Sequence, residues 1–173
     1  MSLRMANGLP ERIVQVLRDF LPAELDLIDS EEGGTATPDV ADADVHEWPR
    51  SLINSFPAIT VNVLNTRNMA THSTSFGGEV HALHDVDIAA HVAVAGDNKD
   101  APRLQTLIFR YASGIYRVLC VKKVMLETSG DPTTFAHDVA WRTMNYGPLS
   151  AQAGGTVTRS AVVGVEVRKV EVE

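Results

Sequence analysis

The sequence has one cysteine, few aromatic side chains and no long apolar run. Cys120 is the single thiol of the 173-residue chain, so no disulfide can form within one copy. Its place inside a predicted helix fits a small buried apolar side chain better than a nucleophile. The apolar runs are only a few residues long, too short for a transmembrane helix, and residues 1–20 lack the apolar core and cleavage site of a signal peptide. We therefore expect a protein that neither spans a membrane nor is secreted.

Catalytic and phosphate-binding motifs are also absent from the sequence. It has no GxSxG turn, no CxxC pair and no HExxH pattern. The glycine pairs Gly77-Gly78 and Gly154-Gly155 lack the context of a P-loop or a GxGxxG loop. Trp48 and Trp141 could stack on a ligand, but tryptophans more often fill cores or interfaces. No catalytic or ligand-binding signature therefore stands out in the sequence.

Positive charge is missing from one long stretch. Residues 24–47 contain nine acids and no Lys or Arg. Residues 1–50 hold 11 acids and 4 bases, which accounts for the whole net charge of −7, and the rest of the chain is neutral. A segment of this kind does not bind nucleic acid by releasing counterions from phosphates. The protein as a whole is therefore not predicted to be a basic DNA-binding protein.

The same region is predicted to lie outside regular structure. Residues 23–50 contain Gly33-Gly34, Pro38 and Pro49 and few large apolar side chains, so they cannot build a core of their own. We expect an acidic loop excursion over about 23–50. Loops of this length are often functional, so the excursion is either an interaction segment or a solvated flexible loop.

The most regular pattern in the chain is an amphipathic helix over residues 97–123. Asp100 and Pro102 are typical of a helix start. Its apolar face is formed by residues spaced three and four apart: Leu104, Leu107, Ile108, Tyr111, Ala112, Ile115, Val118 and Leu119.

Three arginines are spaced seven apart on another face of this helix: Arg103, Arg110 and Arg117. The ordinary interpretation is a solvated basic face. A functional interpretation is that they pair with the acidic segment of a neighbouring copy and steer a ring-shaped assembly together. The candidate interface residues are then these arginines together with Glu31, Glu32, Asp42 and Asp44.

The remaining elements follow from shorter patterns. We expect a helix over 9–21 that ends at Pro22, strands over 57–64 and 80–95, a loop over 65–79, and a hairpin of strands 134–146 and 156–172. The predicted fold is a single α+β domain over residues 1–173, with a mainly antiparallel four-stranded sheet and two helices packed on one face. Mixed Ala, His and Asp content on the other face suggests partial burial in an assembly.

A second interpretation concerns metal binding. Asp85, Asp87 and His91 alternate with apolar residues on the strand over 80–95, near His81 and His84. Strand geometry places His81 and His91 about 33 Å apart, so only Asp85 and Asp87 are neighbours on one face. A small metal-dependent enzyme or ligand-binding domain using Asp85, Asp87 and His91 is therefore the weaker alternative.

The order of elements resembles the tail terminator and head–tail joining proteins of long-tailed bacteriophages. The resemblance is carried by a short N-terminal helix, an excursion, the PAITVNV and VDIAAHVAVAG strands, the RLQTLIFRYASGIYRVL helix and a final hairpin ending in VVGVEVRKVEV. It covers nearly the whole chain as a pattern of elements.

The resemblance implies a structural virion protein without catalytic residues or cofactor. Proteins of this family form a ring of about six copies that caps the tail tube and docks to the neck. The implied partners are further copies of the chain, the tail tube protein and a head-completion or neck protein, and DNA passes through the lumen. An acidic lumen formed by residues 24–47 would repel phosphates. Another head–tail connector protein is the alternative within the same resemblance.

Overall fold

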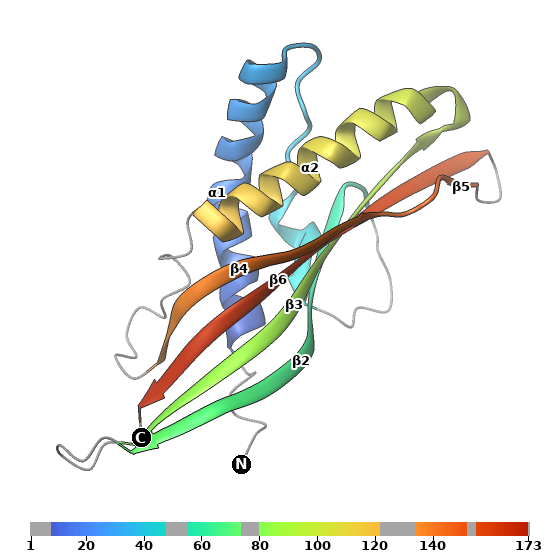
Figure 1. Cartoon of the computed structure of the whole chain (residues 1–173). Coiled ribbons are helices and arrows are strands. Elements are labelled where there is room, and N and C mark those ends of the chain that lie inside the picture. The colour runs from blue at the N-terminus through green and yellow to red at the C-terminus, as the bar shows by residue number, and fades with distance from the viewer. Residues whose placement is uncertain (1–7, 48–54, 74–79, 122–133, 152–154, 173) are drawn as a thin grey trace.

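The computed structural model describes residues 8–47, 55–73, 80–121, 134–151 and 155–172. Two helices, two 3-10 turns and six strands follow one another in these ranges. Figure 1 shows how the helices and the long strands are arranged. The strand order in the sheet is β1-β2-β3-β6-β4, and the short β5 pairs with β6 beside this path. The expected α+β class is confirmed. The expected four-stranded sheet is extended by two short strands, and it is mixed because β1 runs parallel to β2.

The four long strands form the expected antiparallel sheet. These are β2 (Ala58–Ser73), β3 (Val80–Asp97), β4 (Thr134–Tyr146) and β6 (Thr156–Val172). Strand β3 pairs with both β2 and β6, and β4 pairs with β6 as the predicted hairpin. The short strands are β1 (Val45–Glu47) and β5 (Ser150–Ala151).

The residues that cover one face of the sheet are the alternating apolar ones found in the sequence. Val86, Ile88, Ala90, Val92 and Val94 of β3 all lie in the hydrophobic core, beside Val163, Val165 and Val167 of β6. Their neighbours of opposite parity, such as Ala89 and Asp85, are buried but do not belong to this core. Because successive side chains of a strand alternate between faces, the core lies on one face of the sheet.

Helix α2 (Ala101–Val121) confirms the central prediction. The seven buried members of its apolar face are Leu104, Ile108, Tyr111, Ala112, Ile115, Val118 and Leu119, and Leu107 packs against them. The helix begins directly after the 3-10 turn Asn98–Asp100, and Pro102 lies in its first turn, where no backbone N–H is needed. Figure 1 shows α1 and α2 crossing on the same side of the sheet.

Helix α1 (Leu9–Glu32) is 24 residues long, so the predicted end at Pro22 is wrong. The helix continues because Leu21, Leu25 and Ile28 extend the apolar stripe at spacings of four and three, and all three are buried. Close approach to α2 is possible at Gly114, where a Cβ would lie 2.9 Å from Leu21 Cδ1. Packing of this stripe outweighs the hydrogen bond that Pro22 cannot donate.

Most of the described part of the predicted acidic excursion belongs to regular secondary structure. Residues 24–32 belong to α1, which ends at Glu32. The N–H of the next residue, Gly33, donates to the Asp29 carbonyl oxygen at 2.8 Å and caps the helix. Gly33 and Gly34 both have positive φ, which suits glycine at the end of a helix. The chain then runs to the 3-10 turn Asp42–Asp44 and the parallel strand β1. Residues 48–50, with Trp48, lie outside the described ranges.

The predicted loop over 65–79 is wrong in its first part, because β2 continues to Ser73. Its polar sequence follows from position: Asn65 and Arg67 pair with Asp87 and Asp85 of β3, on the face opposite the helices. Register shifts after Val63 and after Asn68 interrupt the simple alternation of apolar residues. Residues 74–79, including Gly77-Gly78, lie outside the described ranges.

No helix in the described ranges is long and apolar enough to cross a membrane.

Candidate functional site

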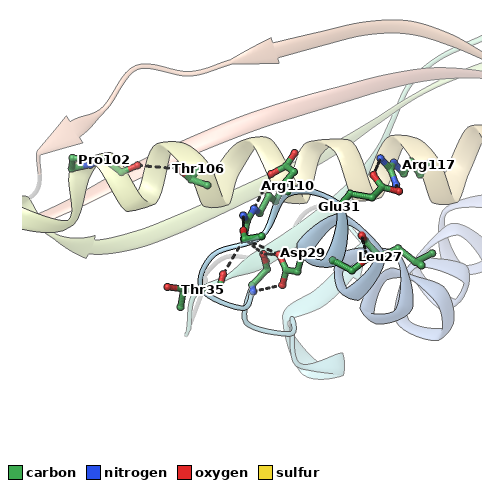
Figure 2. Close-up of polar contacts among 12 residues, drawn as sticks. Leu27, Asp29, Glu31, Thr35, Pro102, Thr106, Arg110 and Arg117 are labelled. Carbon is green, nitrogen blue, oxygen red and sulfur yellow. Dashed lines mark hydrogen bonds and ion pairs between the residues drawn. The ribbon is translucent and has the colours of Figure 1, made fainter.

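Arg110 is the centre of a buried ionic cluster between the two helices. Arg110 is only 6% exposed, although the spacing of the arginines predicted a solvated face. The guanidinium donates to the Asp29 carboxylate at 2.8 Å and to Glu32 at 3.0 Å, as Figure 2 shows for Asp29. The prediction failed here because the C-terminal turn of α1 lies over this part of α2.

The same side chain also binds the backbone that follows α1. It donates to the carbonyl oxygens of Gly33 at 2.6 Å and Thr35 at 2.9 Å. A cation at this place compensates the negative end of the helix dipole as well as two carboxylates. Tyr111 adds a second attachment one residue along α2, because its hydroxyl donates to the carbonyl oxygen of Pro38. Arg110 and Tyr111 together hold residues 33–38 against α2.

Asp29 connects this segment to α1 from the other side. Its carboxylate accepts the Thr37 backbone N–H at 2.5 Å and the Thr37 hydroxyl at 2.6 Å. Burial acts to raise the pKa of Asp29, but the hydrogen bonds from Thr37 and the charge of Arg110 lower the pKa below its ordinary value. The carboxylate is therefore charged at neutral pH and stabilises the cluster.

Arg117 makes a second, more exposed ion pair between the helices. It donates to both oxygens of Glu31, at 2.6 and 3.1 Å, in a bidentate arrangement that Figure 2 shows. The hydrogen bond from Arg117 lowers the pKa of Glu31. Both partners are partly solvated, so the pair contributes little to stability.

The predicted interface residues thus fall into two groups. Arg110, Arg117, Glu31 and Glu32 pair with one another or with Asp29 inside one chain. Arg103 is exposed, and Asp42 and Asp44 lie in the 3-10 turn before β1; across the described ranges, no ion pair joins Arg103 to either of them. Four of the seven predicted interface residues therefore form ion pairs within one chain, where pairs between copies were expected. That any of the seven takes part in an interface between copies stays a prediction.

A second set of charges lies on the sheet face opposite the helices. Arg67 of β2 donates through Nη2 to Asp87 of β3 and, at 2.9 Å, to Glu166 of β6. Arg142 of β4 pairs with the same Glu166. Arg168 of β6 pairs with Asp85 of β3 at 3.0 Å. Charges of opposite sign therefore alternate across all four long strands.

This network bears on the metal-site alternative. Asp85 and Asp87, the two neighbouring carboxylates, each have an arginine partner. His91 lies four residues further along β3, about 13 Å from Asp87 at strand spacing, between Thr60 and Val162. Burial lowers the pKa of His91, so this imidazole is neutral at physiological pH. No group of three His, Cys, Asp or Glu residues able to hold a metal occurs among the residues that are described, and the side chains of His81 and His84 lie outside that set.

A cavity and a depression are present, and neither gathers catalytic groups. The cavity, of about 190 Å³, lies between the start of α2 and the end of β3, and Phe56, Leu104 and Leu107 line it with Arg103 and Asp100. The depression, of about 410 Å³, lies on the open sheet face around Arg67, Arg142, Thr143 and Gly164. A Cβ at Gly164 would lie 2.6 Å from Thr143 Cγ2, so a larger residue at 164 would clash with Thr143.

Aromatic side chains line the seam between α2 and the edge strand β4. Phe109 packs edge-on against Tyr146 with ring centroids 4.6 Å apart, and Tyr116 lies edge-on to Trp141 at 6.3 Å. Trp141 is 55% exposed, the largest fraction among these four rings. Sequence reasoning treated Trp141 alone and missed the seam, because it forms only when a helix and a distant strand come together.

These features define an α+β domain with one sheet face covered by helices and the other face carrying an ordered row of ion pairs. No protein-family model matches the chain, and no curated protein matches it.

Proposed function

We propose that the protein is a structural component of a long-tailed bacteriophage, a tail terminator whose copies form a ring on the end of the tail tube. The observation that carries the proposal is the one-sided sheet: both helices share a single core with one face, while the other face and the outer edge of β4 have no cover within the described ranges. Long uncovered edges are unusual in a monomer because they invite pairing with another chain. A protein whose task is assembly uses them.

The charge pattern of the open face also suits a geometric role. The charged groups there neutralise each other in pairs, which leaves an ordered polar surface. Small residues, Ala89 and Gly164, occupy the next register row. Such a face can line a water-filled lumen, where the ion pairs keep their solvent and no desolvation cost arises.

In this proposal the partners are further copies of the chain, the tail tube protein and a head-completion or neck protein. DNA passes through the ring without sequence-specific contact. The acids that stay exposed, among them Asp26, Asp39 and Asp42, would face the lumen and repel phosphates. Arg110 and Arg117 already pair with Asp29, Glu31 and Glu32, which reduces the negative charge available for this purpose.

The test has two stages. Light scattering after size exclusion and negative-stain microscopy should show a closed ring of about six copies. Added to purified tail tubes that lack a terminator, the ring should bind one tube end and stop further growth; tubes without added protein are the control. A solitary monomer at all concentrations, or a ring that ignores tubes, would refute the terminator role.

A different neck or connector protein is the second candidate, supported by the same order of elements. It predicts binding to head or neck particles and no effect on tube growth. A single experiment that offers the ring both tubes and tail-less heads separates the two roles.

A further inference from the structure

The free edges of the sheet are the strongest unexplained feature. Strand β1 covers only Ile59, Thr60 and Val61 of β2, so residues 62–73 have no described partner on their outer side. At the opposite side, β4 pairs with β6 along one edge, and none of the described strands pairs with the other. Such an edge exposes a row of unpaired N–H and C=O groups.

The two edges match in position and direction. Following the register across the sheet, Asn62 pairs with Ala89, Ala89 with Gly164, and Gly164 with Thr143. In the same way Thr71 is level with Thr134 through Ala82 and Glu171. The uncovered stretch 62–71 of β2 is therefore level with 134–143 of β4, and the three β1-covered residues lie beyond it.

Each neighbouring pair among the four long strands is antiparallel, so β4 runs opposite to β2. A second copy in the same orientation places its β2 antiparallel to β4 of the first. That arrangement continues the alternation of directions already present inside the sheet. The contact is heterologous, the type that generates rings.

One register row supplies the charge complementarity. Arg67 of β2 is opposite Asp85 of β3, Asp85 is opposite Arg168 of β6, and Arg168 is opposite Asp138 of β4. The signs alternate plus, minus, plus, minus, and residues opposite one another lie on the same face. The row begins with a cation at one free edge and ends with an acidic residue at the other.

We infer that a second copy of this chain adds the 62–73 portion of β2 to the outer edge of β4, with its Arg67 opposite Asp138. The row of alternating charges then continues through the joint. Arg67 is suited to this role because its hydrogen bonds to Asp87 and Glu166 use only Nη2, and half of its side chain is exposed. The inference deepens the proposed ring by naming the surfaces that join its copies.

Disulfide trapping tests this joint. Residues directly opposite in an antiparallel pair have Cα atoms about 4.5 to 5.5 Å apart, within the range that a disulfide spans. Within one chain, β3 and β6 separate positions 67 and 138 by roughly 14 Å, so no intrachain bond can form. A chain with Arg67→Cys and Asp138→Cys, on a Cys120→Ser background, should therefore link only between copies.

Mild oxidation of this full-length variant should convert the monomer band on a non-reducing gel into a ladder that ends at the number of copies in the ring. The pair Asn65→Cys with Ala140→Cys lies in the next register row on the same face of the sheet and should give the same ladder. This second pair guards against a folding defect in the first variant. The control pair is Arg67→Cys with Asn145→Cys, which lies roughly 20 Å further along β4 and should give only the single-cysteine background.

The outcomes separate this inference from the proposed function. Rings that form without either cross-link overturn the joint and leave the ring in place. Cross-linked ladders that never cap tail tubes support the joint and overturn the terminator role. Monomers that give no cross-link at any concentration overturn both.

Discussion

Replacing Arg110 with alanine should cost the protein much of its stability, because Arg110 is the only cation in the ionic cluster described between α1 and α2. The substitution leaves Asp29, whose side chain is 15% exposed, without its cation, and it leaves the Gly33 and Thr35 carbonyl oxygens without a donor. Removing one partner of a buried ion pair costs about 3–5 kcal/mol. Asp29 keeps its two bonds from Thr37, and Glu32 remains half solvated, so we expect the lower end, about 3 kcal/mol.

Urea unfolding followed by circular dichroism measures this loss at a protein concentration where both proteins have the same oligomeric state. Arg103→Ala removes an exposed arginine from the same helix and should change the free energy of unfolding by less than about 0.5 kcal/mol. A protease that cleaves after glutamate should also cut at Glu32, next to the released segment 33–40, sooner in the Arg110 variant. A loss below about 1 kcal/mol for Arg110→Ala would show that the cluster is solvated and that the reasoning from burial is wrong.

Two further predictions concern the same pair of helices. Gly114→Leu should destabilise the protein by roughly 1–3 kcal/mol or more, because the new side chain would enter the space of Leu21 and Leu25. Thr106→Leu, on the exposed side of α2, is the control and should be nearly neutral. Equal effects of the two changes on thermal unfolding would contradict the close contact between the helices. Asp29 has a lowered pKa, so its stabilising contribution is fully present above about pH 4 and is lost as the pH falls through the folded-state value. Asp29→Asn should therefore flatten the decline of stability below about pH 4, and identical pH profiles for the two proteins would exclude Asp29 as the responsible group.

Local periodicity was enough to predict α2 and most of the strands. The apolar face of α2 and the alternating residues of β3 and β6 are buried as their spacing indicated. These patterns are read within one element, because a helix or strand with an apolar side must bury it against something. The pairing of β4 with β6 followed from their closeness in the chain.

The failures lie where two elements decide together. Pro22 marks a helix end by local rules, yet α1 passes through it because Leu21 and Leu25 pack against α2 at Gly114. Polar residues after Leu64 are typical of a loop, yet the backbone stays in β2 because β3 supplies its hydrogen bonds as far as Ser73. In both places the local preference is weaker than the sum of tertiary contacts.

Composition and periodicity are properties of the chain alone, and they were sufficient to predict an acidic α+β fold with one dominant amphipathic helix and strands of alternating apolar residues. The burial of Arg110 among carboxylates, and the single register row that contains Arg67, Asp85, Arg168 and Asp138, depend on how distant elements pack together. Asp85 and Arg168 become neighbours there although they are 83 positions apart in the chain, and which strands pair, and in which register, is set by the packing of the whole sheet.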